Sequence, residues 1–129
     1  MKQKEIFRQA LEDLETLKKY GPPYSVITQA GAIVLFKRCL ERGCMAIRET
    51  LEAKGYHDIR MDSVRPILKR AYAFELIEDE KDWLQMLDDY QQEYDFIEDS
   101  ALPVLSRIQE IYIPLLEKLK YELDNYGEI

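Results

Sequence analysis

The stretch Tyr24–Lys54, with the sequence YSVITQAGAIVLFKRCLERGCMAIRETLEAK, decides the fold. Its apolar residues recur at steps of three and four, which places them on one face of an α-helix. The members of this stripe are Ile33, Phe36, Leu40, Cys44, Ile47 and Leu51. A second stripe runs beside it through Ala32, Leu35, Cys39, Gly43, Ala46 and Thr50. Together they make an apolar arc wide enough to meet more than one neighbouring helix. The pattern therefore predicts a long central helix that other segments must cover.

The same periodicity predicts helices on both sides of this stretch. Gly21-Pro22-Pro23 ends the first helix and Gly55 ends the second, because proline and glycine interrupt the helical backbone. Pro114 predicts a kink in the last helix. The connections are short, so neighbouring helices should be antiparallel. We expect one domain over residues 1–129, an all-α, up-and-down bundle of about five helices with a four-helix core. The flanking helices are expected at about Lys2–Tyr20, Ser63–Leu76, Asp79 to beyond Tyr94, and Ser100–Asn125.

Composition and charge restrict the classes of function. The chain has 129 residues and a net charge of −7, which weighs against a nucleic-acid groove built from Lys and Arg. No window approaches 18 uninterrupted apolar residues, and Met1–Ala10 is too polar for a signal peptide, so we expect a cytoplasmic protein without a membrane span. Residues 37–70 carry nine basic and five acidic side chains, whereas residues 78–99 carry ten acidic ones and one lysine. This asymmetry indicates electrostatic selection of a partner, or simply a solvated acidic face.

Few residues in the chain could carry catalysis or hold a metal. His57 is the single histidine and falls in a predicted loop, so a His-based metal or acid–base site is not expected. Cys39 and Cys44 are five residues apart on one helix, point away from each other and cannot form a disulfide within the chain. Three acidic residues, Asp88, Asp89 and Asp95, could bind a divalent cation, but acidic residues on an outer face are usually only solvated. We therefore predict no catalytic residue, no metal and no cofactor.

Four segments carry a resemblance to a known family. Together they span nearly the whole chain, and their order and spacing resemble the HEPN superfamily, in particular its nucleotidyltransferase substrate-binding proteins. The segments are FKRCLE at 36–41 with IRETLEAKG at 47–55, SVRPILKRAY at 63–72 with LIED at 76–79, WLQMLDD at 83–89, and IYIPLL at 111–116.

The resemblance implies an antiparallel helical bundle, commonly a homodimer, that binds a minimal nucleotidyltransferase encoded beside it. Many relatives form two-component toxin–antitoxin pairs. In those pairs the HEPN protein is a metal-independent ribonuclease with an Arg-x4–6-His motif, often continued as His-x-Tyr. The nucleotidyltransferase can silence the ribonuclease by adenylylating that tyrosine.

This sequence departs from the ribonuclease motif. Counted back from the last helix, Asp89 stands at the arginine, Tyr94 at the histidine and Phe96 at the tyrosine. Counted forward from Trp83, Tyr90 and Asp95 stand at the arginine and histidine. On either count no side chain titrates near neutrality to move a proton from a ribose hydroxyl, and none offsets the phosphate charge. The resemblance thus implies the fold and the partner but not the nuclease.

Three hypotheses remain open from the sequence. The leading one is a non-catalytic module that binds a nucleotidyltransferase partner or supports its nucleotide or substrate. Its contact surface would be the acidic, tyrosine-bearing end of the fourth helix: Asp89, Tyr90, Glu93, Tyr94, Asp95 and Phe96. The second is a ribonuclease toxin that uses Tyr90, Tyr94 and Glu93. The third is an interaction module unrelated to nucleotides.

Overall fold

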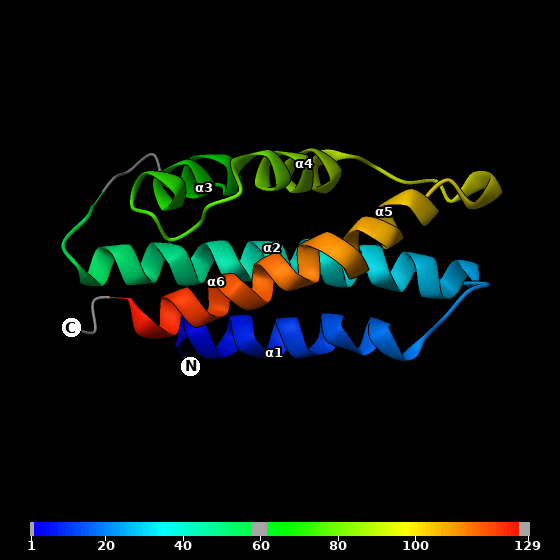
Figure 1. Cartoon of the computed structure of the whole chain (residues 1–129), viewed down its shortest axis with the longest axis horizontal. Helices are drawn as coiled ribbons and strands as arrows, with labels where there is room; N and C mark the ends of the chain where they lie inside the picture. The colour runs from blue at the N-terminus through cyan, green and yellow to red at the C-terminus, as the bar shows by residue number, and fades with distance from the viewer. Residues whose placement is uncertain (1, 58–61, 127–129) are drawn as a thin grey trace.

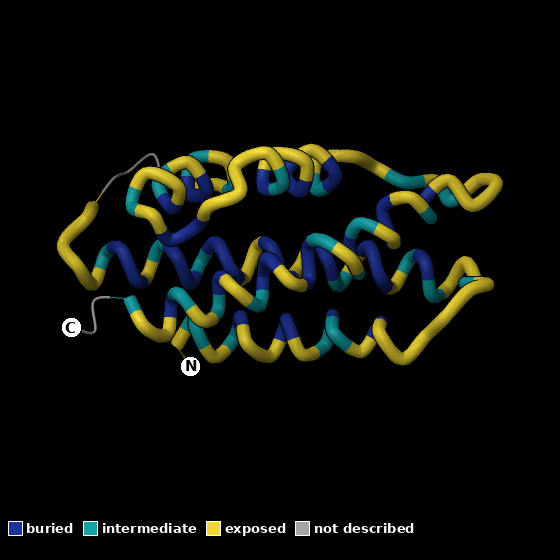
Figure 2. Tube along the Cα trace, viewed as in Figure 1, coloured by how far each residue is buried: buried dark blue, intermediate teal, exposed yellow. Residues whose placement is uncertain are grey.

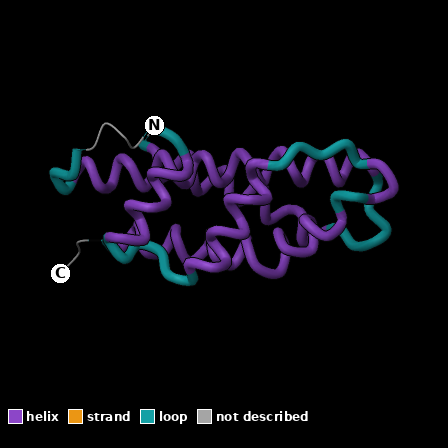
Figure 3. The backbone as a smooth tube through the Cα atoms, turned by 90° about the horizontal axis from the view of Figure 1, so that it is seen from above, coloured by secondary structure: helices purple, strands orange, loops and turns teal. Residues whose placement is uncertain are grey.

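The computed structural model describes residues 2–57 and 62–126, which form helices and loops but no strand (Figure 3). The all-α prediction is confirmed. The elements are α1 (Gln3–Glu15), a 3₁₀ turn (Thr16–Lys19), α2 (Val26–Ala53), α3 (Val64–Ala73), α4 (Glu80–Gln91), a short irregular turn (Ile97–Asp99), α5 (Leu102–Arg107), a π-helical turn (Ile108–Tyr112) and α6 (Ile113–Asn125). The last three elements are continuous and count as one long helix.

The predicted central helix is α2. Ser25 caps its N-terminus, where its hydroxyl oxygen accepts a hydrogen bond from the backbone N–H of Thr28 at 3.0 Å. Gly55 follows the C-terminus with φ = 90°, a left-handed conformation that glycine adopts without strain. Both expected stripes are buried except Leu35, which is half-buried, and α2 contacts α1, α3, α5 and α6. The stretch from Tyr24 to Lys54 therefore organises the core as predicted.

α1, α2 and the continuous helix of α5 and α6 run up and down along the long axis of the molecule (Figure 1). The chain passes along α1, returns along α2, crosses back by way of α3 and α4, and returns again through α5 and α6. α3 and α4 are short and lie obliquely to the long axis, on the side of α2 where a regular four-helix bundle has its third long helix (Figure 3). The buried residues line the surfaces that the helices turn toward α2, and the outer faces are exposed (Figure 2).

Gly43 allows α1, α2 and α6 to approach one another closely. A Cβ at this position would lie 3.1 Å from the ring of Phe7 in α1 and 3.5 Å from the side chain of Leu119 in α6. The first distance is tighter than ordinary van der Waals contact, so a side chain at this position would require the Phe7 ring to shift by a few tenths of an ångström. The small residue in the second predicted stripe therefore suits this close packing.

Several predicted boundaries are wrong by part of a turn or more. The first helix ends at Glu15 and continues to Lys19 only as a 3₁₀ turn, and α3 ends at Ala73 and not near Leu76. The largest correction concerns the fourth helix, which ends at Gln91. Residues 92–96 follow it as a loop, so the acidic, tyrosine-bearing end of the predicted helix is mostly not helical.

The last helix is irregular one turn before Pro114. The backbone N–H of Ile113 bonds to the carbonyl oxygen of Ile108, five residues back, which is the spacing of a π-helix. Pro114 has no N–H to offer the preceding turn, so it favours a local change of winding at this point. The expected disturbance of the helix thus takes the form of a widened turn at 108–112.

Cys39 and Cys44 are free and buried, as expected for small apolar side chains. Burial raises the pKa of Cys39 to about 12, so its thiol stays protonated and unreactive at neutral pH. His57 lies exposed in the loop after α2. Among the helices described, none combines the length and the apolar character needed to cross a bilayer.

Candidate functional site

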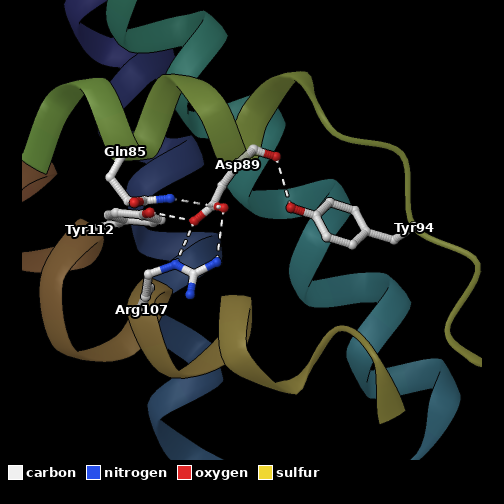
Figure 4. A network of polar contacts seen from close by, with 5 residues as sticks. All are labelled: Gln85, Asp89, Tyr94, Arg107 and Tyr112. Carbon is white, nitrogen blue, oxygen red and sulfur yellow. Dashed lines mark hydrogen bonds and ion pairs between the residues drawn. The ribbon is translucent and has the colours of Figure 1, made fainter. Parts of the chain in front are cut away.

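The predicted site divides into a buried half and an exposed half. The buried half is centred on Asp89, near the end of α4, whose exposed fraction is only 3%. Arg107 reaches it from α5 with both forks of its guanidinium (Figure 4): Nε–H donates to Oδ2 at 2.7 Å and Nη2–H donates to Oδ1 at 2.9 Å. Such bidentate pairs between arginine and a carboxylate are among the stronger and more directional polar contacts in proteins.

Two further donors complete the surroundings of this carboxylate. The hydroxyl of Tyr112 donates a short hydrogen bond to Oδ2, and Nε2 of Gln85 lies 3.5 Å from Oδ1. The ring of Tyr112 is fully buried and stacks on Phe36 of α2, with 5.3 Å between the ring centroids. Burial and the neighbouring Asp89 raise the pKa of the Tyr112 phenol, which therefore remains a donor.

The cluster formed by Asp89, Arg107, Tyr112 and Gln85 ties α4 to the last helix. Both carboxylate oxygens are satisfied, and a buried carboxylate is tolerated only with such compensation. The hydrogen bond to Asp89 is the main reason that the pKa of Arg107 is raised above its ordinary value. Asp89 therefore contributes little negative charge to the surface, and it serves as an internal connection between helices. The sequence interpretation placed it on a contact surface; the structure places its side chain inside the molecule.

The loop after α4 is held to the helices at two points. The hydroxyl of Tyr94 donates to the backbone carbonyl of Asp89 at 2.9 Å (Figure 4), a carbonyl in the last turn of α4 that also accepts from the backbone N–H of Gln92 at 3.4 Å. Lys37 of α2 donates to the carbonyl of Gln92 at 2.6 Å, and its ammonium lies 5.6 Å from the centroid of the Tyr94 ring. The Tyr94 hydroxyl thus bonds to a carbonyl at the C-terminal end of α4, where a further helical turn would otherwise supply the donor.

The remaining predicted residues have separate positions. Tyr90 is half-buried, and its hydroxyl donates to Oε2 of Glu41 at 2.6 Å. Glu93 is exposed and has no ion pair or hydrogen bond within the described residues. Asp95 accepts from the backbone N–H of Ile97 at 3.1 Å and shapes the loop. Phe96 packs against the core with φ = 61°.

The tyrosines cannot act as bases near neutral pH. Burial, followed by the charge of Asp89, raises the pKa of Tyr94 to about 12. Burial and the hydrogen bond to Glu41 raise the pKa of Tyr90 further above its ordinary value. Neither phenol is therefore ready to accept a proton from a ribose hydroxyl, and Glu93 lies exposed beside them without a cationic neighbour in an ion pair. In the described ranges, no group of three or more His, Cys, Asp and Glu side chains is arranged to hold a metal ion.

The sequence interpretation missed Arg107, Tyr112 and Lys37. One signal for Arg107 was present: it is the single basic residue between Lys81 and Lys118. Tyr112 lies on the predicted buried stripe of the last helix, and a buried phenol needs a hydrogen-bond partner. No local sequence pattern indicates that both side chains bond to Asp89, because a loop lies between them and Asp89. Arg107 is 18 residues and Tyr112 is 23 residues away from Asp89 in the sequence.

The fold and the site define a helical-bundle protein. Asp89, which stands at the arginine of the ribonuclease motif when the count runs back from the last helix, connects α4 to the last helix inside the molecule. A comparison with protein families gives the family itself. The chain belongs to the HEPN-type family described as nucleotidyltransferase substrate binding protein like, whose model matches residues 2–125. Searches of curated proteins and of solved structures found no match. The match covers nearly the whole chain and confirms the resemblance stated from the four segments.

Proposed function

We propose that this protein is a non-catalytic module that binds a minimal nucleotidyltransferase encoded nearby and supports its handling of a nucleotide or substrate. The observation that carries this proposal is the pairing of Asp89 with Arg107 and Tyr112. On the count back from the last helix, the position of the catalytic arginine holds a buried carboxylate whose donors come from the chain's own helices. The ribonuclease site of catalytic relatives would need a cation there, free to meet phosphate.

The proposed contact surface is the exposed side of residues 93–98. It presents Glu93 and Glu98 as exposed carboxylates, Ile97 with an exposed fraction of 64%, and the half-buried rings of Tyr94 and Phe96. An apolar centre, aromatic edges and acidic neighbours suit a basic patch on a partner protein. The loop is held in place by Lys37 and by the Tyr94 hydroxyl, so little conformational entropy is lost when it binds.

The proposal includes the setting in which the module acts. The family description supports a nucleotidyltransferase as partner, and a two-component pair of the toxin–antitoxin type, in the cytoplasm, would place both proteins together. A homodimer fits the charge asymmetry, because the basic middle of one copy could meet the acidic segment of another. Light scattering on the purified protein measures the oligomeric state. A monomer at micromolar concentration would contradict the proposed homodimer.

Charge reversal at Glu93 tests the contact surface. We expect Glu93→Lys to weaken binding to the co-expressed nucleotidyltransferase by roughly fivefold to tenfold in calorimetry, as a like charge then meets the basic patch. Wild-type binding should weaken as salt is raised. The melting temperature should not change, because Glu93 has no partner within the described chain.

Glu12→Lys is the matched control, with the same change of charge on the exposed face of α1, across the bundle. It should bind like the wild type. If Glu93→Lys binds the nucleotidyltransferase as tightly as the wild type, residues 93–98 are not the contact surface. If the wild type does not bind it at all, the nucleotidyltransferase is not the partner. Cleavage of RNA by the purified protein, lost in Tyr94→Phe, would instead favour the ribonuclease hypothesis.

A further inference from the structure

A groove between α3 and α4 is separate from the site described above. We call it the α3–α4 groove. It encloses about 300 Å³ and is lined by six apolar or aromatic side chains and three charged ones. That volume is at the lower end of the range for small-molecule sites, about 300 to 1,000 Å³. Its apolar floor includes Leu68, Trp83 and Leu87, and its outer wall includes Leu84, which is 54% exposed.

The charged side chains of the groove are mostly cationic. Arg65 and Lys69 lie four residues apart on α3, a spacing that places two like charges on one helical face. Both are exposed, and neither forms an ion pair or hydrogen bond with any described residue. The third charged residue, Glu80, stands in the first turn of α4, where the helix dipole favours a carboxylate. A protein with a net charge of −7 thus keeps, beside an apolar groove, two cations that no described residue pairs with.

Trp83 gives the groove an aromatic surface, and its exposed fraction is 4%. Its indole N–H forms no hydrogen bond within residues 2–57 and 62–126, but it is not one of the buried polar groups without a partner, so water can reach it. A bound molecule with an anionic oxygen could take the place of that water while its apolar part covers Leu68 and Leu87.

We propose that the α3–α4 groove binds a small organic anion with a compact, aromatic or branched apolar body. The apolar part fills the space over Leu68, Trp83 and Leu87, and the anionic group meets Arg65 and Lys69 at the α3 wall. The binding energy comes from apolar area removed from water, and selectivity for an anion comes from the two cations. This site is independent of the nucleotidyltransferase surface, which lies beyond the other end of α4 (Figure 1).

A fluorescent probe can locate such binding, because Trp83 is the only tryptophan in the chain. The probe is 1-anilinonaphthalene-8-sulfonate, an aromatic sulfonate that receives excitation energy from a nearby indole. Its uncharged counterpart is N-phenyl-1-naphthylamine, which has the same rings without the sulfonate. We expect saturable quenching of Trp83 emission, sensitised emission from the sulfonate probe, and weaker binding of the uncharged probe.

Three variants separate the contributions. Lys69→Met should weaken binding of the sulfonate by about fivefold and leave the uncharged probe unchanged, since one charge contact is lost. Leu84→Asp should abolish binding of the sulfonate, because it places a carboxylate on the groove wall. Val34→Asp is the matched control: Val34 is 63% exposed on α2, outside the groove, and this variant should bind like the wild type. Both aspartate positions are exposed, and circular dichroism checks that the variants are folded.

Each other result overturns the proposal. Wild-type protein without sensitised emission has no such site. Equal binding of both probes, unchanged in Lys69→Met, would make the groove a plain apolar surface without preference for anions. An equal loss in Leu84→Asp and Val34→Asp would place the probe elsewhere on the protein.

Discussion

Asp89 and Glu15 are carboxylic acids in opposite surroundings. Asp89 is the more deeply buried, with 5% of its side chain exposed, and it faces a guanidinium, a phenol and an amide. Glu15 has 30% of its side chain exposed and faces a second carboxyl group, Glu117 of α6, with the ammonium of Lys18 at 3.9 Å as its one cationic neighbour among the described residues. The hydrogen bond with Glu117, followed by partial burial, raises the pKa of Glu15 to about 7. The comparison shows that the neighbour, more than depth, decides how an acid contributes to this bundle.

The largest expected effect comes from removing the cation beside Asp89. Arg107→Met should lower the free energy of unfolding by about 3 kcal/mol, because it leaves a buried carboxylate without its charge partner. This is the lower end of the range for buried pairs, since one third of the Arg107 side chain is exposed. Urea denaturation measures the loss.

Arg48→Met provides the matched control for that variant. Arg48 also pairs with a carboxylate, Glu52, at 2.9 Å, but both side chains are about 40% exposed. Exposed pairs of this kind contribute about 0–1 kcal/mol. If the two arginine variants lose the same stability, burial of Asp89 does not have the importance assigned to it here.

A smaller loss is expected when the phenol beside Asp89 is removed. Tyr112→Phe keeps the ring stacked on Phe36 and deletes the hydrogen bond to the carboxylate. Hydrogen bonds to charged groups contribute about 1.5–3 kcal/mol, so unfolding in urea should require about 2 kcal/mol less than in the wild type. Tyr121→Phe, at a position that is 65% exposed, should leave stability unchanged. A Tyr112→Phe variant as stable as wild type would mean that this contact contributes nothing.

The smallest expected effect is the pH dependence of stability that comes from the Glu15–Glu117 pair. The pKa of Glu15 is raised from 4.5 to about 7, so the folded state holds an extra proton between these values. This contribution to stability is fully present below pH 4.5 and is lost as the pH rises through about 7. Glu117 has a lowered pKa and acts in the opposite sense, and Lys18, 3.4 Å from it, favours its charged form.

Glu15→Gln should remove this pH dependence, because an amide donates to Glu117 at any pH. We expect the melting temperature of the variant, relative to wild type, to rise between pH 5 and pH 8. Glu12→Gln, one turn earlier on α1, keeps the Glu15–Glu117 pair and removes only the smallest of the contributions that raise the pKa of Glu15, so its profile should stay close to that of the wild type. Parallel profiles for Glu15→Gln and wild type would show that the two carboxyl groups do not share a proton.

The fold was largely predictable from the sequence, whereas the site was predictable only in part. The stripes of α2 and the stop at Gly55 are local patterns, and local patterns determine helices well. The end of α4 was misplaced because Tyr94 follows Tyr90 at a helical step of four. The helix ends earlier because the backbone turns extended at Gln92, with ψ = 150°, and the Tyr94 hydroxyl then bonds back to the Asp89 carbonyl.

The polar centre could not be predicted because its partners are distant in sequence. Asp89 reads as one of several acidic residues in the segment 78–99, and Arg107 as an ordinary polar residue on the edge of a helical stripe. Only their distance in the fold shows that each satisfies the other. Tertiary contacts of this kind leave no periodic signal, so the charge of the segment was judged more exposed than it is.

The π-helical turn at 108–112 acts as an offset in the phase of the last helix. A residue in an α-helix advances by about 100° around the axis, so one extra residue in a turn rotates everything before it by that angle relative to everything after it. The residues of α6 can therefore keep Leu116, Leu119 and Leu123 in the core while Arg107 in α5 points to α4. One continuous helix thereby directs its apolar side chains into the core after the widened turn and its arginine toward α4 before it. Regular α-helical winding would place these residues at other angles around the axis.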